Sequence, residues 1–362
     1  MITREWPLLP VYATGAVFLA FGDRLAGAFD ALWWTALMIA WLFATMLAAA
    51  FAVVRHSESL AAIFGEPYGT LILTLAITAI EVTLISAVML HGPEVSTLAR
   101  DTMYAVIMIV FNGMVGVSLL VGGLRYHEQS YNLQGANSFL AVILPLSVLG
   151  LVLPNFTSSP GQTFSALHEG FLMVMSVALY AAFLAIQALR HRHYFVEPDA
   201  ALEAFDRAAL DVRPAAYHGT LLVLYIIPVV LLSKSIATPL EQALDALGAP
   251  VALVGFLVAA LVLSPESLGA VRAALANQLQ RSINLLLGSV LASISLTIPA
   301  VLAIGFASDR TVVLGLDALD AVLLVLTLGL STLTFASGRT NILLGAVHLV
   351  LFCAYVVLMF DR

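Results

Sequence analysis

The amino-acid sequence predicts an all-α membrane protein with about eleven transmembrane helices. Of its 362 residues, 61% are hydrophobic and only 10% are charged, whereas roughly a quarter of the residues in a soluble domain are charged. Apolar runs recur from Leu8 to the C-terminus, and many approach the roughly 20 residues that a helix needs to cross the bilayer core. These runs are too long and too evenly apolar for the alternating strands of a membrane barrel, so we expect a helical bundle.

The first predicted helix lies within residues 1–30. Its apolar run has the character of a secretory signal, but no small-residue cleavage site precedes a soluble domain, because another span follows at once. We bound the later spans by charged residues, proline and glycine. They start near Ala31, Gly69, Met103, Phe139, Phe171, Leu221, Val251, Ile283, Val312 and Ile342.

A polar linker at residues 191–216 divides the remaining spans into two groups of five, at residues 31–190 and 217–362. Because an odd number of spans makes the two halves enter the membrane from opposite sides, we predict two inverted five-helix repeats. The linker is interpreted either as a regulatory segment that binds calcium weakly or as a solvated charged loop. Its acidic residues include Glu197, Asp199, Glu203 and Asp206.

Basic residues predict the orientation, because cytoplasmic loops of membrane proteins are enriched in Lys and Arg. With the N-terminus in the cytoplasm, ten of the 15 basic residues fall on the cytoplasmic side and five on the other, which places the C-terminus outside. The net charge of −7 argues against nucleic-acid binding. A single cysteine, Cys353, excludes an intrachain disulfide. The expected partners are membrane lipid, cations and protons; we expect no cofactor, and no feature of the sequence specifies an oligomeric state.

Two glutamates interrupt the predicted spans. Glu81 lies in the apolar run that starts near Gly69, and Glu266 lies in the run that starts near Val251. A charged acid at the bilayer centre costs about 2.5 to 3.5 kcal/mol on insertion scales, so such residues usually face a cavity and act on ions or protons. One acid in each half is the pattern that a midplane ion site requires. The alternative is a pair of protonated structural glutamates that bond to neighbouring hydroxyls or carbonyls.

Further oxygen ligands are expected near these acids, because calcium takes about six to eight of them. Pro265 lacks a backbone N–H, so we predict a helix break or kink that frees carbonyl oxygens beside Glu266. A kink that serves packing alone is the alternative. Among the polar residues within the spans we favour Asn112 and Ser289 as ligands. For most other serines, close helix packing or a bond to the helix's own carbonyls is the better interpretation.

The resemblance to a known family rests on two segments, residues 60–90 and 262–300. The second contains Ser264-Pro-Glu, Ser282-Ile-Asn and Leu287-Gly-Ser. These segments resemble the calcium/cation antiporter superfamily, and in particular its bacterial calcium/proton and sodium/proton exchangers of the ChaA type. The resemblance covers nearly the whole chain, and it implies a multi-pass protein of the bacterial inner (plasma) membrane.

In that family each half carries an essential acidic residue, followed in the next helix by a polar pair. By resemblance, Glu81 and Glu266 are the two acids. The polar pairs are Asn112 with Gly113, which is the looser match, and Gly288 with Ser289.

The resemblance implies a secondary active antiporter, not an enzyme, that exports Ca²⁺ or Na⁺ in exchange for H⁺ by alternating access. The alternatives are a K⁺/H⁺ or Na⁺/H⁺ antiporter with little calcium transport and a passive cation channel. An intramembrane zinc protease fails on spacing, because its motif needs a second His four residues after the first. Tyr131 and Leu172 stand four residues after His127 and His168. An ATP-driven pump is disfavoured because the only lysine, Lys234, follows no Gly-rich turn.

Overall fold

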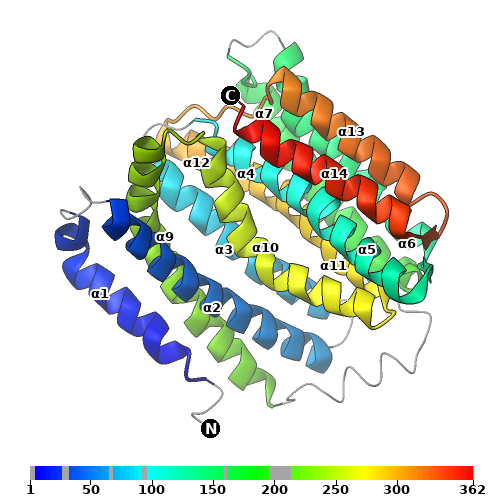
Figure 1. Ribbon diagram of the computed structural model, residues 1–362, viewed down its shortest axis with the longest axis horizontal. Helices are drawn as coiled ribbons and strands as arrows, with labels where there is room; N and C mark the ends of the chain where they lie inside the picture. The colour runs from blue at the N-terminus through cyan, green and yellow to red at the C-terminus, as the bar shows by residue number, and fades with distance from the viewer. Residues whose placement is uncertain are drawn as a thin grey trace. The chain divides into compact units, whose positions relative to one another are not determined.

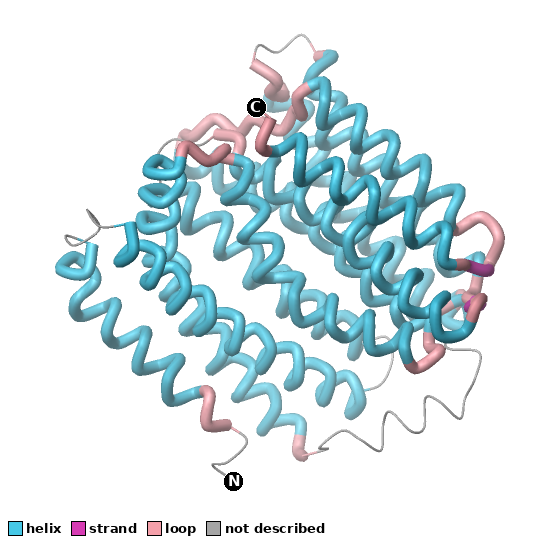
Figure 2. The backbone as a smooth tube through the Cα atoms, viewed as in Figure 1, coloured by secondary structure: helices cyan, strands magenta, loops and turns pink. Residues whose placement is uncertain are grey.

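The computed structural model describes residues 5–26, 32–64, 68–91, 96–157, 161–195 and 213–361, and the protein is helical almost throughout these ranges (Figure 1, Figure 2). Two short strands, β1 (Gln129–Ser130) and β2 (Arg339–Thr340), form an antiparallel pair. Eight of the described helices are long and apolar enough to cross a membrane, and three more are apolar but shorter. The predicted all-α membrane fold is confirmed, while the number of spans and the two inverted repeats stay predictions.

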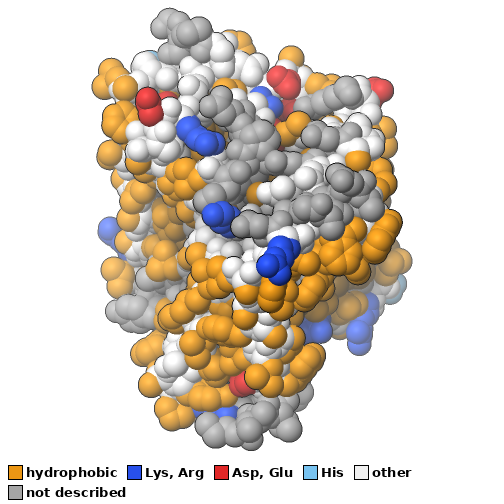
Figure 3. All heavy atoms as spheres, turned by 90° about the vertical axis from the view of Figure 1, so that its left-hand side faces the viewer, with side chains coloured by type: hydrophobic (Ala, Val, Ile, Leu, Met, Phe, Trp, Pro, Cys, Tyr) orange, Lys and Arg blue, Asp and Glu red, His pale blue; other side chains and the backbone are white. Residues whose placement is uncertain are grey.

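The surface has the composition that lipid favours. Hydrophobic side chains dominate the face drawn in Figure 3, and charged side chains are scattered among them. Large apolar side chains such as Trp33, Leu37 and Phe51 are exposed on one helix. Contiguous apolar surface of this extent is unusual for a soluble monomer, but it is what a bilayer solvates.

The chain forms two compact units. Unit 1 comprises Met1–Leu98 and Asp211–Pro265, and unit 2 comprises Ala99–Leu210 and Glu266–Arg362. Each unit therefore combines segments that lie before and after the polar linker. The two compact units therefore do not coincide with the two predicted repeats.

Unit 1 is organised around two long helices, α2 and α9. The buried side chains Met38, Leu42, Met46, Ala49 and Val53 follow one another at intervals of three or four residues along α2, which places them on one face of the helix. This helix packs mainly against α9 and α3, and α1 packs beside both α2 and α9 (Figure 1). The helices of unit 1 are α1 (Leu8–Ala26), α2 (Leu32–Phe64), α3 (Tyr68–His91), α9 (Ala215–Leu247) and the first part of α10 (Ala252–Leu275).

Unit 2 contains the end of α10 and helices that are interrupted by π-helical or 3-10 turns. Within it α5 packs against α14, α11 packs against α6, and α12 packs against α7. Its first half contains α4 (Leu98–Ile107), η1 (Met108–Met114), α5 (Val115–Tyr126), α6 (Leu133–Ser147), η2 (Val148–Val152), η3 (Leu153–Phe156), α7 (Ala166–Ala185), η4 (Ile186–Arg190) and η5 (Arg192–Tyr194). Its second half contains α11 (Leu279–Ala292), η6 (Ser293–Thr297), α12 (Ile298–Ser308), α13 (Ala318–Thr334) and α14 (Ile342–Met359).

The span predicted to start near Val312 begins later, at Ala318. Residues 310–317 are not helical. Val312, Leu314 and Leu316 are buried at every second position, which is the period of an extended chain rather than of a helix. The prediction was wrong at this point because the apolar run by itself does not distinguish a helix from a buried extended segment.

Hydrogen bonds from elsewhere in unit 2 stabilise this extended segment. The backbone N–H of Gly315 donates to the Gln162 carbonyl at 3.1 Å, and that of Leu316 donates to the Leu151 carbonyl at 2.8 Å. The guanidinium of Arg100, which is buried, donates from Nη1 to the Gly315 carbonyl at 2.9 Å. These bonds replace the ones that a helix would make internally.

Glycines allow α5 and α14 to approach closely. A Cβ atom added at Gly345 would lie 2.6 Å from the backbone nitrogen of Leu120 and 2.8 Å from the carbonyl oxygen of Gly116. Neither backbone atom can move aside independently of its helix. Small residues at such crossings let helices pack by van der Waals contact in lipid, where the hydrophobic effect does not drive helices together.

We predict that Gly345→Ala destabilises the purified protein by about 1 to 3 kcal/mol, because the added methyl group pushes α5 and α14 apart. Thermal unfolding in detergent measures the effect. Gly329→Ala on α13 is the matched control, since an added Cβ there meets nothing within 4 Å. Equal melting temperatures for the two variants would contradict the close packing described here.

Candidate functional site

Glu81 is a buried acid on an apolar helix of unit 1. It lies on α3, its exposed fraction is 1%, and it is the only Asp, Glu, Lys or Arg on that helix. The hydroxyls of Thr83 and Ser86 donate to carbonyls of their own helix, those of Ala79 and Val82. These two hydroxyls have the structural role expected of serine and threonine in transmembrane helices. The acid therefore remains the chemically distinctive group on α3.

Glu266 lies on α10, where unit 2 begins, and its exposed fraction is 6%. The structure corrects one expectation here, because α10 continues as a helix through Pro265 without a break. The proline still lacks the N–H that would bond to the Leu261 carbonyl, four residues earlier. A kink at Pro265 remains a prediction. The Leu261 carbonyl is the one backbone oxygen that the proline leaves without its usual helical partner near Glu266.

Asn112 belongs to a buried hydrogen-bond network in unit 2. It lies in the π-helical segment η1 and donates from Nδ2 to Thr327 Oγ1 at 2.8 Å. Its Oδ1 lies 3.2 Å from His348 Nδ1, and Thr334 Oγ1 lies 2.9 Å from His348 Nε2. Because the Asn112 oxygen is an acceptor, we assign the imidazole proton to Nδ1, which leaves Nε2 to accept from Thr334. The amide is therefore held in one orientation by α13 and α14.

The sequence did not single out His348 or Thr327. The available signal was a lone histidine in an apolar helix, because an ionisable residue within a transmembrane span usually pairs with another polar group. The partner is 236 positions away in the sequence, so spacing gave no indication of it.

The remaining predicted residues of unit 2 lie near η1. Ser289 is on α11, and α11 packs against η1, so Asn112 and Ser289 occupy neighbouring helices. An added Cβ at Gly113 would lie 3.3 Å from the Phe352 ring, which gives this glycine a packing role. At Gly288 the nearest atom, on Phe139, is 3.8 Å away, which is ordinary contact.

Glu81 belongs to unit 1, and the other three predicted ligands belong to unit 2. The linker acids Glu197, Asp199, Glu203 and Asp206 lie outside the described residues. Among the residues that are described, no three His, Cys, Asp or Glu side chains converge to hold a metal ion. The predicted cation ligands are thus single carboxyls combined with amide and hydroxyl oxygens.

A helical membrane protein with buried acids inside its apolar helices has the features of an ion transporter. The chain matches the family described as sodium/calcium exchanger protein over residues 34–189 and 218–360, and it belongs to that family. It is therefore a secondary transporter. The two matched segments flank the polar linker.

Individual proteins support this placement. The chain is 46% identical to the putative ionic transporter y4hA of Sinorhizobium fredii (strain NBRC 101917 / NGR234) over 312 residues, covering 86% of this chain and 85% of that protein. It is 43% identical to the sodium-potassium/proton antiporter ChaA of Escherichia coli (strain K12) over 318 residues, covering 87% and 86% of the two chains. The solved structure of native YfkE matches its fold with a TM-score of 0.74 at 19% identity, covering 98% of this chain and all of the other.

We predict that His348→Leu destabilises the protein by about 1 to 3 kcal/mol, because the substitution leaves the Asn112 oxygen and the Thr334 hydroxyl without this buried partner. A double-mutant cycle with Asn112→Leu should give a coupling energy of about 0.6 to 1.7 kcal/mol, the range known for hydrogen bonds in membrane proteins.

Unfolding of the purified protein in detergent measures both quantities. Cys353→Ser is the control, since Cys353 lies on the same helix but is exposed. Additivity of the two substitutions within about 0.3 kcal/mol would contradict the network.

Proposed function

We propose that the chain is a secondary active antiporter of the bacterial inner membrane, which exports Ca²⁺ or Na⁺ in exchange for H⁺ by alternating access. The observation that carries the proposal is the burial of Glu81 and Glu266 within apolar helices, one on each side of the linker. Family membership supports it. The relative from E. coli is named for sodium, potassium and protons, which supports K⁺/H⁺ or Na⁺/H⁺ exchange with little calcium transport as the second candidate.

The proposed coupling follows from the cost of a bare carboxylate in apolar surroundings. Such a group loses its hydration, so it is stable only when it holds a proton or binds a cation. A cation that enters from the cytoplasm displaces protons from Glu81 and Glu266, and the loaded protein opens to the outside and releases it. Protons then neutralise the acids for the return step. The protein without a bound cation, in which both acids are charged, converts poorly between its inward and outward openings, and this prevents leakage of ions.

Asn112 and Ser289 are the ligands proposed in addition to the two acids. Calcium needs about six to eight oxygens at roughly 2.3 to 2.6 Å, so carboxyl, amide, hydroxyl, carbonyl and water oxygens must combine. The His348 hydrogen bond fixes the Asn112 oxygen but leaves one of its two lone pairs for a cation. Inverted repeats, with a cytoplasmic N-terminus, remain the proposed topology.

We predict that Glu81→Gln and Glu266→Gln each abolish exchange while the protein still folds, because glutamine keeps the volume and polarity but cannot ionise. Glu→Asp should weaken cation affinity more than proton binding, since it withdraws the carboxylate by about 1.5 Å. Proton flux in sealed vesicles, with Ca²⁺, Na⁺ and K⁺ supplied in turn, measures the exchange and separates an antiporter from a channel.

The matched control is Glu128→Gln, which removes an exposed acid that pairs with Arg339 at 3.6 Å. Membrane expression is measured for every variant, so that misfolding is distinguished from loss of function. Well-expressed Gln variants at both buried positions that exchange cations at the rate of the parent protein would refute the mechanism.

The topology is tested independently with reporter fusions. A reporter placed after Arg362 should be read outside the cytoplasm, and one inserted within residues 196–212 should be read inside, as the distribution of basic residues predicts. Reporters found on the same side of the membrane would rule out the inverted-repeat topology.

A further inference from the structure

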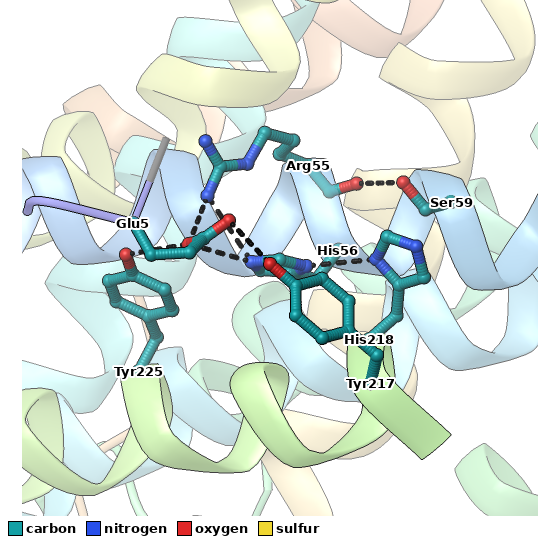
Figure 4. Close-up of polar contacts among 7 residues, drawn as sticks. All are labelled: Glu5, Arg55, His56, Ser59, Tyr217, His218 and Tyr225. Carbon is teal, nitrogen blue, oxygen red and sulfur yellow. Dashed lines mark hydrogen bonds and ion pairs between the residues drawn. The ribbon is translucent and has the colours of Figure 1, made fainter. Parts of the chain in front are cut away.

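A cluster of polar side chains surrounds Glu5, which lies in the segment before α1 in unit 1 (Figure 4). The surrounding side chains belong to two helices that pack against each other, α2 and α9. Arg55 and His56 come from α2, and Tyr217, His218 and Tyr225 come from α9. None of these residues is among the proposed cation ligands.

Both oxygens of the Glu5 carboxylate accept hydrogen bonds from this cluster. Arg55 Nη2 lies 2.6 Å from Oε2, and the Tyr225 hydroxyl donates to the same oxygen at 3.1 Å. The Tyr217 hydroxyl donates to Oε1 at 3.3 Å. His56 Nε2 lies 3.3 Å from Oε2 and donates a fourth hydrogen bond when it carries the ring proton. The bonds from Arg55 and the two tyrosines do not depend on the state of either histidine.

Ring contacts that do not involve Glu5 hold the tyrosine donors in place. The Tyr225 ring stacks on the His56 ring, with the centroids 5.8 Å apart and the planes inclined by 24°. The Tyr217 ring meets the same imidazole edge-on, at 6.2 Å and 71°. The guanidinium carbon of Arg213 lies 4.8 Å from the centre of the Tyr217 ring. The side chains of α2 and α9, and not the segment before α1, therefore form the donor set.

The donor set favours an ionised carboxylate. Tyr225 is fully buried, so its hydroxyl needs an acceptor, and leaving a buried donor unsatisfied is unfavourable. Arg55 adds a fixed positive charge that a carboxylate neutralises. Burial by itself would raise the pKa of Glu5, but the charges of Arg55 and His56 and the hydrogen bonds outweigh it and lower the pKa. The group that occupies the cluster is therefore an anion.

Helix α1 brings Glu5 to the cluster. The Tyr12 hydroxyl on α1 donates to the Leu224 carbonyl on α9 at 2.9 Å, and Trp41 Nε1 on α2 donates to Thr14 Oγ1 on α1 at 3.0 Å. These bonds fix α1 against the same two helices that carry the donors. Glu5 is thus a tethered ligand, and a group on a short tether has an effective concentration in the millimolar range.

We propose that the cluster around Glu5 is a carboxylate-binding site built by α2 and α9, and that Glu5 is its internal ligand. The site fits a planar group with two acceptor oxygens, because Arg55 and Tyr225 bind one oxygen and Tyr217 binds the other. In the intact chain the site holds the segment before α1 against α2 and α9. A free carboxylate of the acetate class binds there once the Glu5 side chain is removed. This site is separate from the proposed antiport and does not depend on it.

The test is acetate binding to the full chain with Glu5→Ala, because acetate corresponds to the fragment that this substitution removes. Saturation-transfer NMR in detergent measures binding at about pH 7.5, where a carboxylic acid is ionised. Sodium chloride replaces sodium acetate along the titration, so that the sodium concentration and the ionic strength stay constant. We expect saturable binding with a dissociation constant in the millimolar range. The parent protein, whose site is filled by Glu5, should show no such binding, and uncharged acetamide should not bind to the variant.

Two further variants identify the place at which acetate binds. Arg55→Met, added to Glu5→Ala, should weaken acetate binding at least about tenfold, because it removes the charge-assisted hydrogen bond. Glu128→Ala is the matched control, since it also removes the acid of a Glu–Arg pair, the exposed one that Glu128 forms with Arg339. It should create no acetate site, because an exposed arginine in water holds a carboxylate only weakly.

Thermal unfolding of the same samples keeps the test decisive. Acetate should raise the melting temperature of Glu5→Ala toward that of the parent protein, and it should leave the parent unchanged. If little folded Glu5→Ala protein is recovered, purification in acetate should restore the yield and acetamide should not. Equal acetate binding by the parent and by Glu5→Ala would overturn the proposal, as would binding that Arg55→Met leaves unchanged. A Glu5→Ala protein that acetate neither binds nor restores would overturn it as well.

Discussion

The structure depends on one constraint, which is that a backbone in lipid must satisfy its hydrogen bonds internally. Helices meet this constraint alone, and the described residues are helical almost throughout. One exception in unit 2, at residues 310–317, meets it by other means, because Arg100, Leu151 in η2 and Gln162 in a turn supply partners. A buried arginine is costly unless it is paired, and Arg100 pairs with the buried Asp101 at 2.9 Å while it donates to this segment.

The same constraint applies to side chains and separates two kinds of buried polar group. Asn112 and His348 satisfy each other and two threonines, so this network fixes the arrangement of η1, α13 and α14. Glutamates cannot be satisfied so simply, since a carboxyl needs a proton or a positive partner. Under the proposed mechanism, protons and cations compete for such an acid, and this competition is the coupling.

Hydropathy predicted the fold class because lipid acts on each helix separately. The long apolar runs that became α2 and α9 were predicted from composition alone, and the buried acids were recognised because an acid in a span is rare. The segment after Val312 was misassigned as helix, because in an apolar run the sequence does not show that every second side chain is buried. His348 and the cluster around Glu5 were missed because their partners are hundreds of residues away or on other helices, and no local pattern encodes such pairs.

Glu5 and Glu81 show why burial alone does not identify a transport site. The Glu5 carboxylate already accepts four hydrogen bonds, and the Arg55 guanidinium at 2.6 Å occupies the place that a cation would take. A fixed positive charge neutralises an acid permanently, so such a group cannot exchange its partner during a transport cycle. The role proposed for Glu81 requires the opposite property, which is a carboxyl whose partner is exchanged during the cycle. The partners of an acid, and not its burial alone, therefore decide whether it can hold a segment in place or exchange ions.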